Sequence, residues 1–338
     1  MVSMKDISVA CGVSIATVSK ALNGHKDISE DTKRLIKNKA DEMGYFPNSS
    51  ARALKMNKSY NLGVLLMDEA RSGLTHNYFA SILESFKFTA EKRGYDITFI
   101  SGSRQRKDKM SFLECCRYRG IDGVVIACIN FHDTEVYDLI QSELPVVTID
   151  HIFNSRIAII SDNVKGVKEL INYIYQCGHR KIAFINAGDG SSVTNARISS
   201  FYRTVYELGL DIPEEYVRAA HYRDTEATAK ITNELLDLSD PPTCIMFQDD
   251  FASIGGINAI KARGLMIPED ISVTGYDGIQ LVKYMEPVLT TVCQDTKRMG
   301  QYAAERLIDM IEKPKATIIE HIVIPPKLDM GATVGKIG

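Results

Sequence analysis

The chain has 338 residues, of which 45% are hydrophobic and 25% are charged, an ordinary globular composition with length for two or three domains. No run of residues approaches the about 18 consecutive apolar positions of a membrane-spanning helix, which excludes a membrane protein. The net charge of -3 is uneven: residues 1–60 have ten basic and six acidic side chains, a balance of +4, and the remainder has -7. Only this basic head is therefore expected to meet a polyanion such as nucleic acid.

The N-terminus and the cysteines indicate a cytoplasmic protein. Charged residues stand where a signal peptide would have its apolar region. The seven cysteines are scattered without CxxC spacing, which fits reduced, buried thiols better than a disulfide framework. The sequence contains no Walker A, GxSxG or HExxH motif, and its histidines are too dispersed for a zinc site. We therefore expect no catalytic centre, no metal and no cofactor.

The head predicts three short helices in chain order. Ser3, with an acidic residue three positions later, matches a capping box that opens a first helix, which ends at Gly12. Ser14 caps a second helix over 15–22, and a third ends at Gly44. Two short helices joined by a glycine-containing turn and supported by a third have the spacing of a helix-turn-helix DNA reader. The alternative is a generic three-helix cap.

From residue 61 the pattern changes to short β-branched runs that alternate with helical stretches. This alternation is typical of parallel sheets built from βαβ units. The fold class is therefore α/β, with a three-helix head and a body of two lobes separated by a cleft. We expect a helix over 163–177 and strands near 62–67, 95–101, 121–127 and 145–149 in one series, and near 182–186, 216–220, 243–247 and 271–276 in the other.

Polar and aromatic side chains follow the expected strands. Ligands of open parallel sheets bind beyond the carboxyl ends of the strands. Carboxylates and a guanidinium beside aromatic rings suit a polyhydroxylated ligand, although any one of them could instead be a helix cap or a core residue. These residues are Asp68, Arg71, His76, Tyr78, Phe79, Asp150, His151, Arg197, Phe201, Asp249, Asp250, Tyr276 and Asp277.

The segments MKDISVACGVSIATVSKALNG and ISEDTKRLIKNKADEMGYFPNSSARAL resemble the N-terminal signature of the LacI/GalR family of transcription regulators. The body segments GHRKIAFI, PTCIMFQDDFASIGGINAIKARGLMIPEDISVTGYDG and PVLTTVCQDTKRMGQYAAERL look like the periplasmic-binding-protein-like core of that family. The resemblance covers essentially the whole chain. It implies a non-enzymatic regulator, most often a repressor, that works as a homodimer on near-palindromic double-stranded operator DNA and responds to a small-molecule effector between the lobes.

Carried over by position, the resemblance implies which side chains meet DNA. Ile15, Ala16 and Lys20 would face base edges in the major groove. Lys20 can donate to guanine O6 and N7, whereas Ile15 and Ala16 offer only apolar contact. Phosphate contacts and a minor-groove wedge complete the implied set: Ser14, Thr17, Ser19 and Asn23 for the phosphates, and Leu54, near Ala51, for the wedge.

The resemblance also implies domain boundaries and effector contacts. The head would span 1–46 and a hinge helix 47–60. One lobe would combine 61–161 with 291–324, the other 162–290 with 325–338, and the chain would cross between them near 161, 290 and 324. The implied effector contacts are Asp150, Arg197, Asp249 and Asp277, with Phe79 and Phe201 as further candidates beside Tyr78.

Two departures from the family pattern bear on the effector. Asp249 stands where many relatives have asparagine, and Gly278 follows Asp277 where a second aspartate is frequent. An extra carboxylate favours ligands that donate hydrogen bonds, so we expect a neutral or amino-bearing saccharide. Three rival interpretations stay open: a solute-binding protein with the same core, a carbohydrate-processing enzyme, and a regulator controlled by a protein corepressor.

Overall fold

The computed structural model describes residues 2–46, 58–67, 72–100 and 110–337. The chain divides into two compact units, a head that ends at residue 59 and a body that begins at Tyr60. Within the described ranges no helix combines the length and the apolar character needed to cross a bilayer. The expected hinge residues Ala51 and Leu54, and also Asp68 and Arg71, lie outside the described residues.

The head contains the three predicted helices: α1 (Met4–Cys11), α2 (Ile15–Leu22) and α3 (Glu30–Glu42). A serine precedes each helix and accepts a hydrogen bond from a backbone N–H of the first turn. These caps satisfy N–H groups that have no partner inside the helix, so the local sequence fixes where each helix begins. The helices enclose a small core of Ile7, Val18, Ala21, Ile36 and Ala40.

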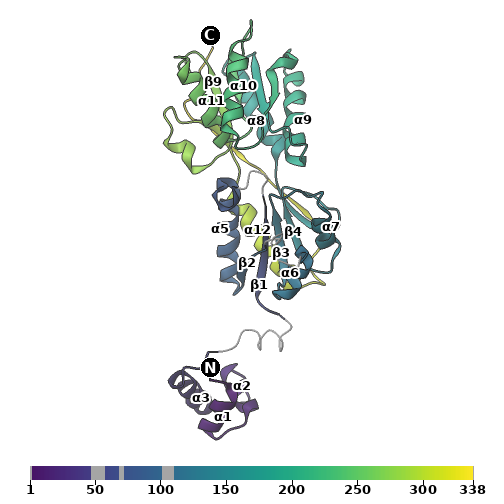
Figure 1. Cartoon of the computed structure of the whole chain (residues 1–338), viewed down its shortest axis with the longest axis vertical. Helices are drawn as coiled ribbons and strands as arrows, with labels where there is room; N and C mark the ends of the chain where they lie inside the picture. The colour runs from purple at the N-terminus through teal and green to yellow at the C-terminus, as the bar shows by residue number, and fades with distance from the viewer. Residues whose placement is uncertain (1, 47–57, 68–71, 101–109, 338) are drawn as a thin grey trace. The chain divides into compact units, whose positions relative to one another are not determined.

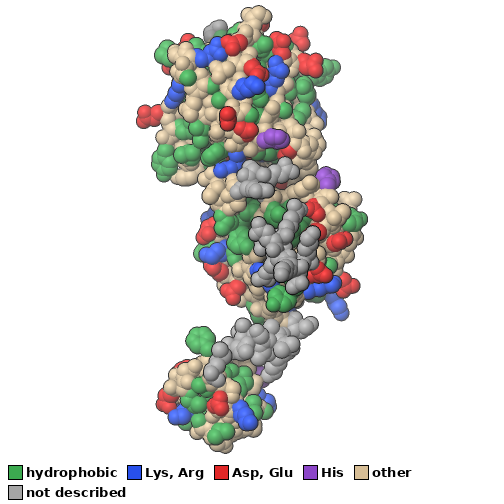
Figure 2. Space-filling view, viewed as in Figure 1, with side chains coloured by type: hydrophobic (Ala, Val, Ile, Leu, Met, Phe, Trp, Pro, Cys, Tyr) green, Lys and Arg blue, Asp and Glu red, His purple; other side chains and the backbone are tan. Residues whose placement is uncertain are grey.

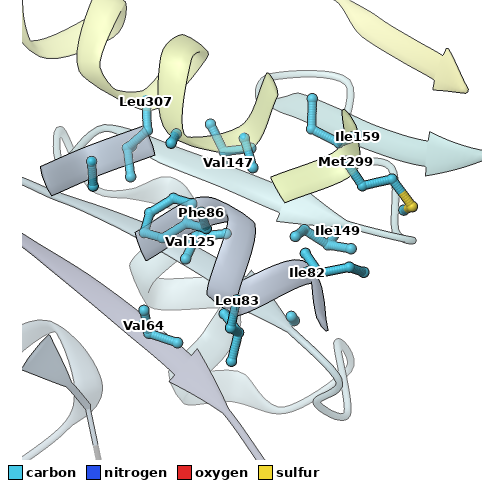
Figure 3. Packing of buried hydrophobic residues seen from close by; sticks show 14 of the residues in the cluster. Val64, Ile82, Leu83, Phe86, Val125, Val147, Ile149, Ile159, Met299 and Leu307 are labelled. Carbon is cyan, nitrogen blue, oxygen red and sulfur yellow. The ribbon is translucent and has the colours of Figure 1, made fainter. Parts of the chain in front are cut away.

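The first lobe of the body is a six-stranded parallel sheet in the order β11-β5-β4-β3-β1-β2. Helices α5 (Asn77–Lys92) and α12 (Thr296–Glu312) pack together on one face, and α6 (Phe112–Tyr118) and α7 (Thr134–Gln141) pack together on the other (Figure 1). Figure 3 shows Phe86 of α5 and Leu307 of α12 packed on strand residues. The strands are β1 (Asn61–Leu66), β2 (Asp96–Phe99), β3 (Gly123–Ala127), β4 (Val146–Ile149), β5 (Ile157–Ser161) and β11 (His321–Ile324).

The second lobe repeats this architecture with the strand order β12-β10-β9-β8-β6-β7. Helices α8 (Asn163–Gln176) and α9 (Ser192–Glu207) cover one face, and α10 (Thr225–Leu236) and α11 (Asp250–Ala262) cover the other. All pairings are parallel except that of β12 with β10. The strands are β6 (Ile182–Asn186), β7 (Val217–Ala219), β8 (Cys244–Met246), β9 (Ser272–Asp277), β10 (Thr290–Cys293) and β12 (Lys327–Asp329).

The chain passes between the lobes three times: after β5, after β10 and after β11. The first and third crossings lie at the expected positions near 161 and 324. The second lies later than the expected position near 290, because residues 290–293 pair with 274–277 of β9 and so still belong to the second sheet. The chain leaves that sheet after Cys293 and enters α12 at Thr296.

Candidate DNA-binding and effector-binding sites

Helix α2 presents one face to the head core and the other to solvent. Val18 and Ala21 are fully buried, whereas Ile15 is 48% exposed and Ala16 and Lys20 are also exposed. The three residues predicted to face base edges therefore lie on the free side of α2. The half-exposed side chain of Ile15 is available for apolar contact, for example with a thymine methyl group.

The residues predicted to contact phosphates also hold the two ends of α2. The Ser14 hydroxyl accepts from the Thr17 N–H at 3.0 Å, and the two hydroxyls are 2.9 Å apart. At the other end the Asn23 amide donates to the Ser19 carbonyl at 2.6 Å. These contacts keep the ends of the helix ordered, and contact of Ser14, Thr17, Ser19 and Asn23 with DNA stays a prediction.

Lys20 has a partner that sequence analysis did not find. Its ammonium donates to the carboxylate of Asp27, with 2.5 Å between Nζ and Oδ2. This hydrogen bond holds the pKa of Asp27 below its usual value. Asp27 lies in the loop between α2 and α3, so the path of this loop, and not a regular secondary structure, brings it to Lys20.

In the body, Arg197 of α9 is the centre of a buried polar cluster. Only 5% of the residue is exposed. Its Nε donates to Asn163 Oδ1 at 2.8 Å and its Nη1 to the Gln248 carbonyl at 3.0 Å. The guanidinium lies 3.6 Å from the ring centroid of Tyr276. Hydrogen bonds and ring stacking thus fix the plane of the guanidinium, as recognition of a specific ligand requires.

A chain of polar contacts continues from Arg197 to the first lobe. Asp277 Oδ1 is 3.7 Å from the guanidinium and accepts from the Gln294 side-chain amide at 2.7 Å. The Tyr78 hydroxyl donates to Asp150 Oδ2 at 2.7 Å and lies 3.3 Å from Gln294 Oε1. Gln294 stands in the second crossing segment, so the structure links the predicted residues of the two lobes through it.

The two linked aspartates have unusual backbones and environments. Asp150 and Asp277 have positive φ angles of 59° and 107°, conformations that are costly outside glycine and that collect at functional sites. Burial raises the pKa of Asp277 to about 7, against the opposing effect of Arg197. Burial also raises the pKa of Asp150. Both carboxyls therefore bind a proton more readily than an exposed aspartate does.

Asp249 and Asp250 have structural partners that weaken our argument from the extra carboxylate. The two oxygens of Asp249 accept backbone N–H groups of Ala252 at 2.7 Å and of Arg223 at 2.8 Å. Asp250 is fully buried and accepts from Thr291 and from the Ile279 N–H. A carboxylate at 249 thus suits two backbone donors, and this position alone does not indicate an effector that donates hydrogen bonds.

The aromatic candidates divide between core and rim. Phe201 is 0% exposed and packs on Phe184 in the second-lobe core. This packing accounts for an aromatic residue at position 201 without an effector. Phe79 is half-buried beside the Tyr78 ring, at 4.9 Å between centroids. His151 is stacked on Phe131 at 4.1 Å at the carboxyl ends of β4 and β3.

Four polar residues of the cluster were not predicted: Asn163, Tyr222, Gln248 and Gln294. Each comes one to three residues after a strand of the second lobe or after β5. Ligand-binding residues follow the carboxyl ends of parallel strands, and this rule could have found them. Asn163 and Gln294 were missed because strands β5 and β10 were not predicted. Gln248 was missed because amide side chains were not considered beside charged groups.

A small pocket opens beside Arg197. Its free space is too small to admit a water molecule, and it is lined by Phe184, Asn186, Ala187, Thr194, Arg197, Tyr222 and Gln248. Small-molecule sites usually measure about 300 Å³ or more. A ligand at this position therefore requires side chains or lobes to move. Among the described residues no group of three or more His, Cys, Asp or Glu side chains could hold a metal ion.

Comparisons with known proteins agree with both halves of this architecture. Residues 3–48 match the family described as bacterial regulatory proteins, lacI family, and residues 171–334 match the periplasmic binding protein-like domain. The "Probable HTH-type transcriptional repressor ExuR" of Bacillus subtilis is 31% identical over 317 residues, which are 93% of this chain and 93% of that protein.

Solved structures show the same fold. The lac repressor dimer bound to operator and the anti-inducer ONPF superposes with a TM-score of 0.83 at 21% identity, over 99% of both chains. A LacI family regulator from Enterococcus faecium with bound ribose gives a TM-score of 0.71 at 22% identity, over 82% of this chain and 100% of that one. At these identities the likeness establishes the fold alone.

Proposed function

Because the chain belongs to the lacI family of bacterial regulatory proteins, we propose that its head reads an operator and that its body senses a saccharide. Like its relatives, it is a DNA-binding transcriptional repressor and not an enzyme. The regulator would act as a homodimer on a near-palindromic operator, since a two-fold protein matches a two-fold site.

The free face of α2 supports the assignment of DNA reading to the head. Lys20 supplies a donor for guanine, and Ile15 and Ala16 supply apolar contact, on the exposed face of a helix, the element that the major groove is wide enough to admit. Ser14, Thr17, Ser19 and Asn23 would contact phosphates from the two ends of α2. Leu54, near Ala51, would insert into the minor groove.

The observation that carries the sensing function is the buried cluster around Arg197 and Asp277. Three contacts hold the Arg197 guanidinium in place. The guanidinium and the neighbouring carboxylates can bind sugar hydroxyls, and an aromatic ring such as that of Tyr276 can stack on a sugar face. A carboxylate has about four lone-pair sites, so Asp150 and Asp277 can accept from a ligand in addition to their present donors.

The charge of this cluster favours a neutral or amino-bearing saccharide over a phosphorylated one. One guanidinium interacts with three carboxyl groups, those of Asp150, Asp249 and Asp277. This balance leaves no surplus of positive charge for an anion even if one of the carboxyls binds a proton. The solved family member from Enterococcus faecium holds ribose, a neutral sugar.

Effector binding between the lobes would change their relative angle and thereby the affinity of the heads for the operator. Gln294, in the second crossing, is the contact through which Asp277 and Tyr78 would respond together. Linkage requires that the operator change effector affinity by the same factor by which the effector changes operator affinity.

A thermal-shift screen tests the sensing function. Neutral and amino monosaccharides and disaccharides form one arm, and sugar phosphates and purines form the other. We expect ligands of the first arm to raise the melting temperature of the full chain, because a ligand that binds only the folded state stabilises it by mass action. A shift by the second arm alone would contradict the saccharide assignment.

A further inference from the structure

The Lys20–Asp27 ion pair differs from the other described ion pairs of the head. Those join side chains within α3, three residues apart: Lys33 with Glu30, Arg34 with Asp31, and Lys39 with Glu42. Lys20 and Asp27 instead join the last turn of α2 to the loop that follows it, and about half of each side chain is exposed, 47% and 52%. Because Lys20 is itself one of the predicted base contacts, its partner Asp27 is a direct neighbour of that set.

Both partners keep unused hydrogen-bonding capacity. An ammonium group has three donors, and the contact with Asp27 uses one. A carboxylate has about four acceptor sites, and the contact with Lys20 occupies one of them. The pair can thus contact further groups without separating, and it then presents two donors beside an acceptor.

This order of groups is complementary to the major-groove edge of one base pair. In a G·C pair, guanine presents two adjacent acceptors, N7 and O6, and cytosine presents the N4 amino donor next to O6. In an A·T pair a donor, adenine N6, stands between the two acceptors and would face a donor of Lys20. The unused groups of the ion pair therefore match G·C and not A·T.

We propose that Lys20 and Asp27 read one G·C pair together, with Lys20 on the guanine and Asp27 on the cytosine. Asp27 is then a specificity-determining residue. The inference rests on the proposed function in one respect, since α2 must enter the major groove.

A carboxylate in this position has opposite effects on affinity and on specificity. Its negative charge is repelled by the phosphates of any duplex, which weakens binding to all sequences. Its acceptor is useful only where cytosine N4 is present. Loss of Asp27 should therefore strengthen binding to unrelated DNA and weaken discrimination at one base pair, whereas loss of Lys20 should weaken both.

The experiment uses the full chain and a pool of randomised duplexes. The wild-type protein first selects its preferred site from the pool. Dissociation constants are then measured for that site and for single-base-pair variants of it, with wild type, Lys20→Ala, Asp27→Ala and Asp27→Asn. We expect Asp27→Ala to lose about fivefold or more of the discrimination at one G·C pair, and Lys20→Ala to lose discrimination at the same pair. Asp27→Asn keeps an acceptor oxygen without the charge, so it should strengthen binding to all sequences and keep part of that discrimination.

Glu42→Ala is the matched control, because Glu42 also accepts from a lysine, Lys39, on the exposed surface of the head and its removal changes the net charge equally. This variant should leave base preference unchanged. If Asp27→Ala changes all affinities by one factor, or loses discrimination at a different base pair from Lys20→Ala, the proposal is wrong while the repressor function stands. If the wild type enriches no sequence at all, the DNA-reading function itself fails.

Discussion

Arg197 shows how one side chain can be both a structural and a sensing residue. Its guanidinium contacts Asn163, the Gln248 carbonyl and the Tyr276 ring, and it is nearly fully buried. Removing one partner of a buried charged network leaves the others without compensation. A substitution that removes the Arg197 side chain should therefore both lower the stability of the body and abolish its response to effector.

We expect Arg197→Ala to lower the free energy of unfolding of the body by about 3 kcal/mol and to remove the thermal shift caused by saccharides. Urea unfolding and the ligand screen measure these two effects. Arg203→Ala is the control on the same helix, because Arg203 is exposed and paired with Glu207 one turn away, so it should cost less than about 1 kcal/mol. Equal losses in the two variants would contradict the role given to Arg197.

The raised pKa of Asp277 predicts a pH dependence of stability. Burial raises this pKa to about 7 in the folded state, above the value of the unfolded chain. Between the two values the folded state binds more protons, so the contribution of Asp277 to stability is full at low pH and is lost as the pH rises through about 7.

Calorimetry of wild type and Asp277→Asn isolates this contribution. Asparagine keeps an acceptor for the Gln294 amide but does not titrate. The melting temperature of the wild type relative to the variant should be higher at about pH 5 than at about pH 8. A difference that stays constant, or that grows with pH, would show that the Asp277 carboxyl is not destabilised by burial.

At the scale of elements, the helices were predicted better than the strands, because helix signals are local. The serine caps and terminal glycines of the head gave α1 and α2 within about a residue, and the helix expected over 163–177 lies at 163–176 as α8. Strands β5, β10, β11 and β12 were not predicted. The partners of β11 and β12 are distant in sequence, and a short strand depends on its partners for stability more than on its own pattern.

Helix α12 also shows a close approach that periodicity does not reveal. A Cβ atom at Gly300 would lie 2.1 Å from the Ile82 carbonyl oxygen and 2.8 Å from the Phe86 nitrogen of α5. Both neighbours are backbone atoms of a helix and cannot rotate away. The absence of a side chain at Gly300 therefore sets the distance between α5 and α12.

Gly300→Ala should destabilise the body although alanine is the better helix former. The helix propensity of alanine would contribute about 1 kcal/mol of stability, whereas forcing the helices apart costs about 1–3 kcal/mol. We expect a net loss of stability in urea unfolding. Gln301→Ala, at the exposed neighbouring position, should change stability by less than about 0.5 kcal/mol. A more stable Gly300→Ala variant would contradict this packing.

At the scale of the whole molecule, the sequence indicated that the head binds DNA and the body binds an effector, but it did not indicate every contact. The uneven charge separated a basic head from an acidic body, in which acidic and basic side chains are interspersed over the surface seen in Figure 2. The rule of strand ends gave Tyr78, Asp150, Arg197 and Asp277, which the structure brings into one cluster. It could not give Asp27, whose partnership with Lys20 depends on the path of a loop.

The two compact units also predict how the molecule unfolds. The head and the body each have a core of their own, so their stabilities should add independently. Ser14→Ala removes the acceptor of the Thr17 N–H and should cost about 1 kcal/mol, which lowers the melting temperature of a domain of this size by about 4–8 °C.

Scanning calorimetry of the full chain without DNA measures this independence. Ser14→Ala should lower the transition of the head alone, and Gly300→Ala that of the body alone. A saccharide that raises the body transition should likewise leave the head transition in place, because coupling between the sites then arises only when the heads hold an operator. A head transition that moves with effector in the absence of DNA would mean that the body acts on the folding of the head directly.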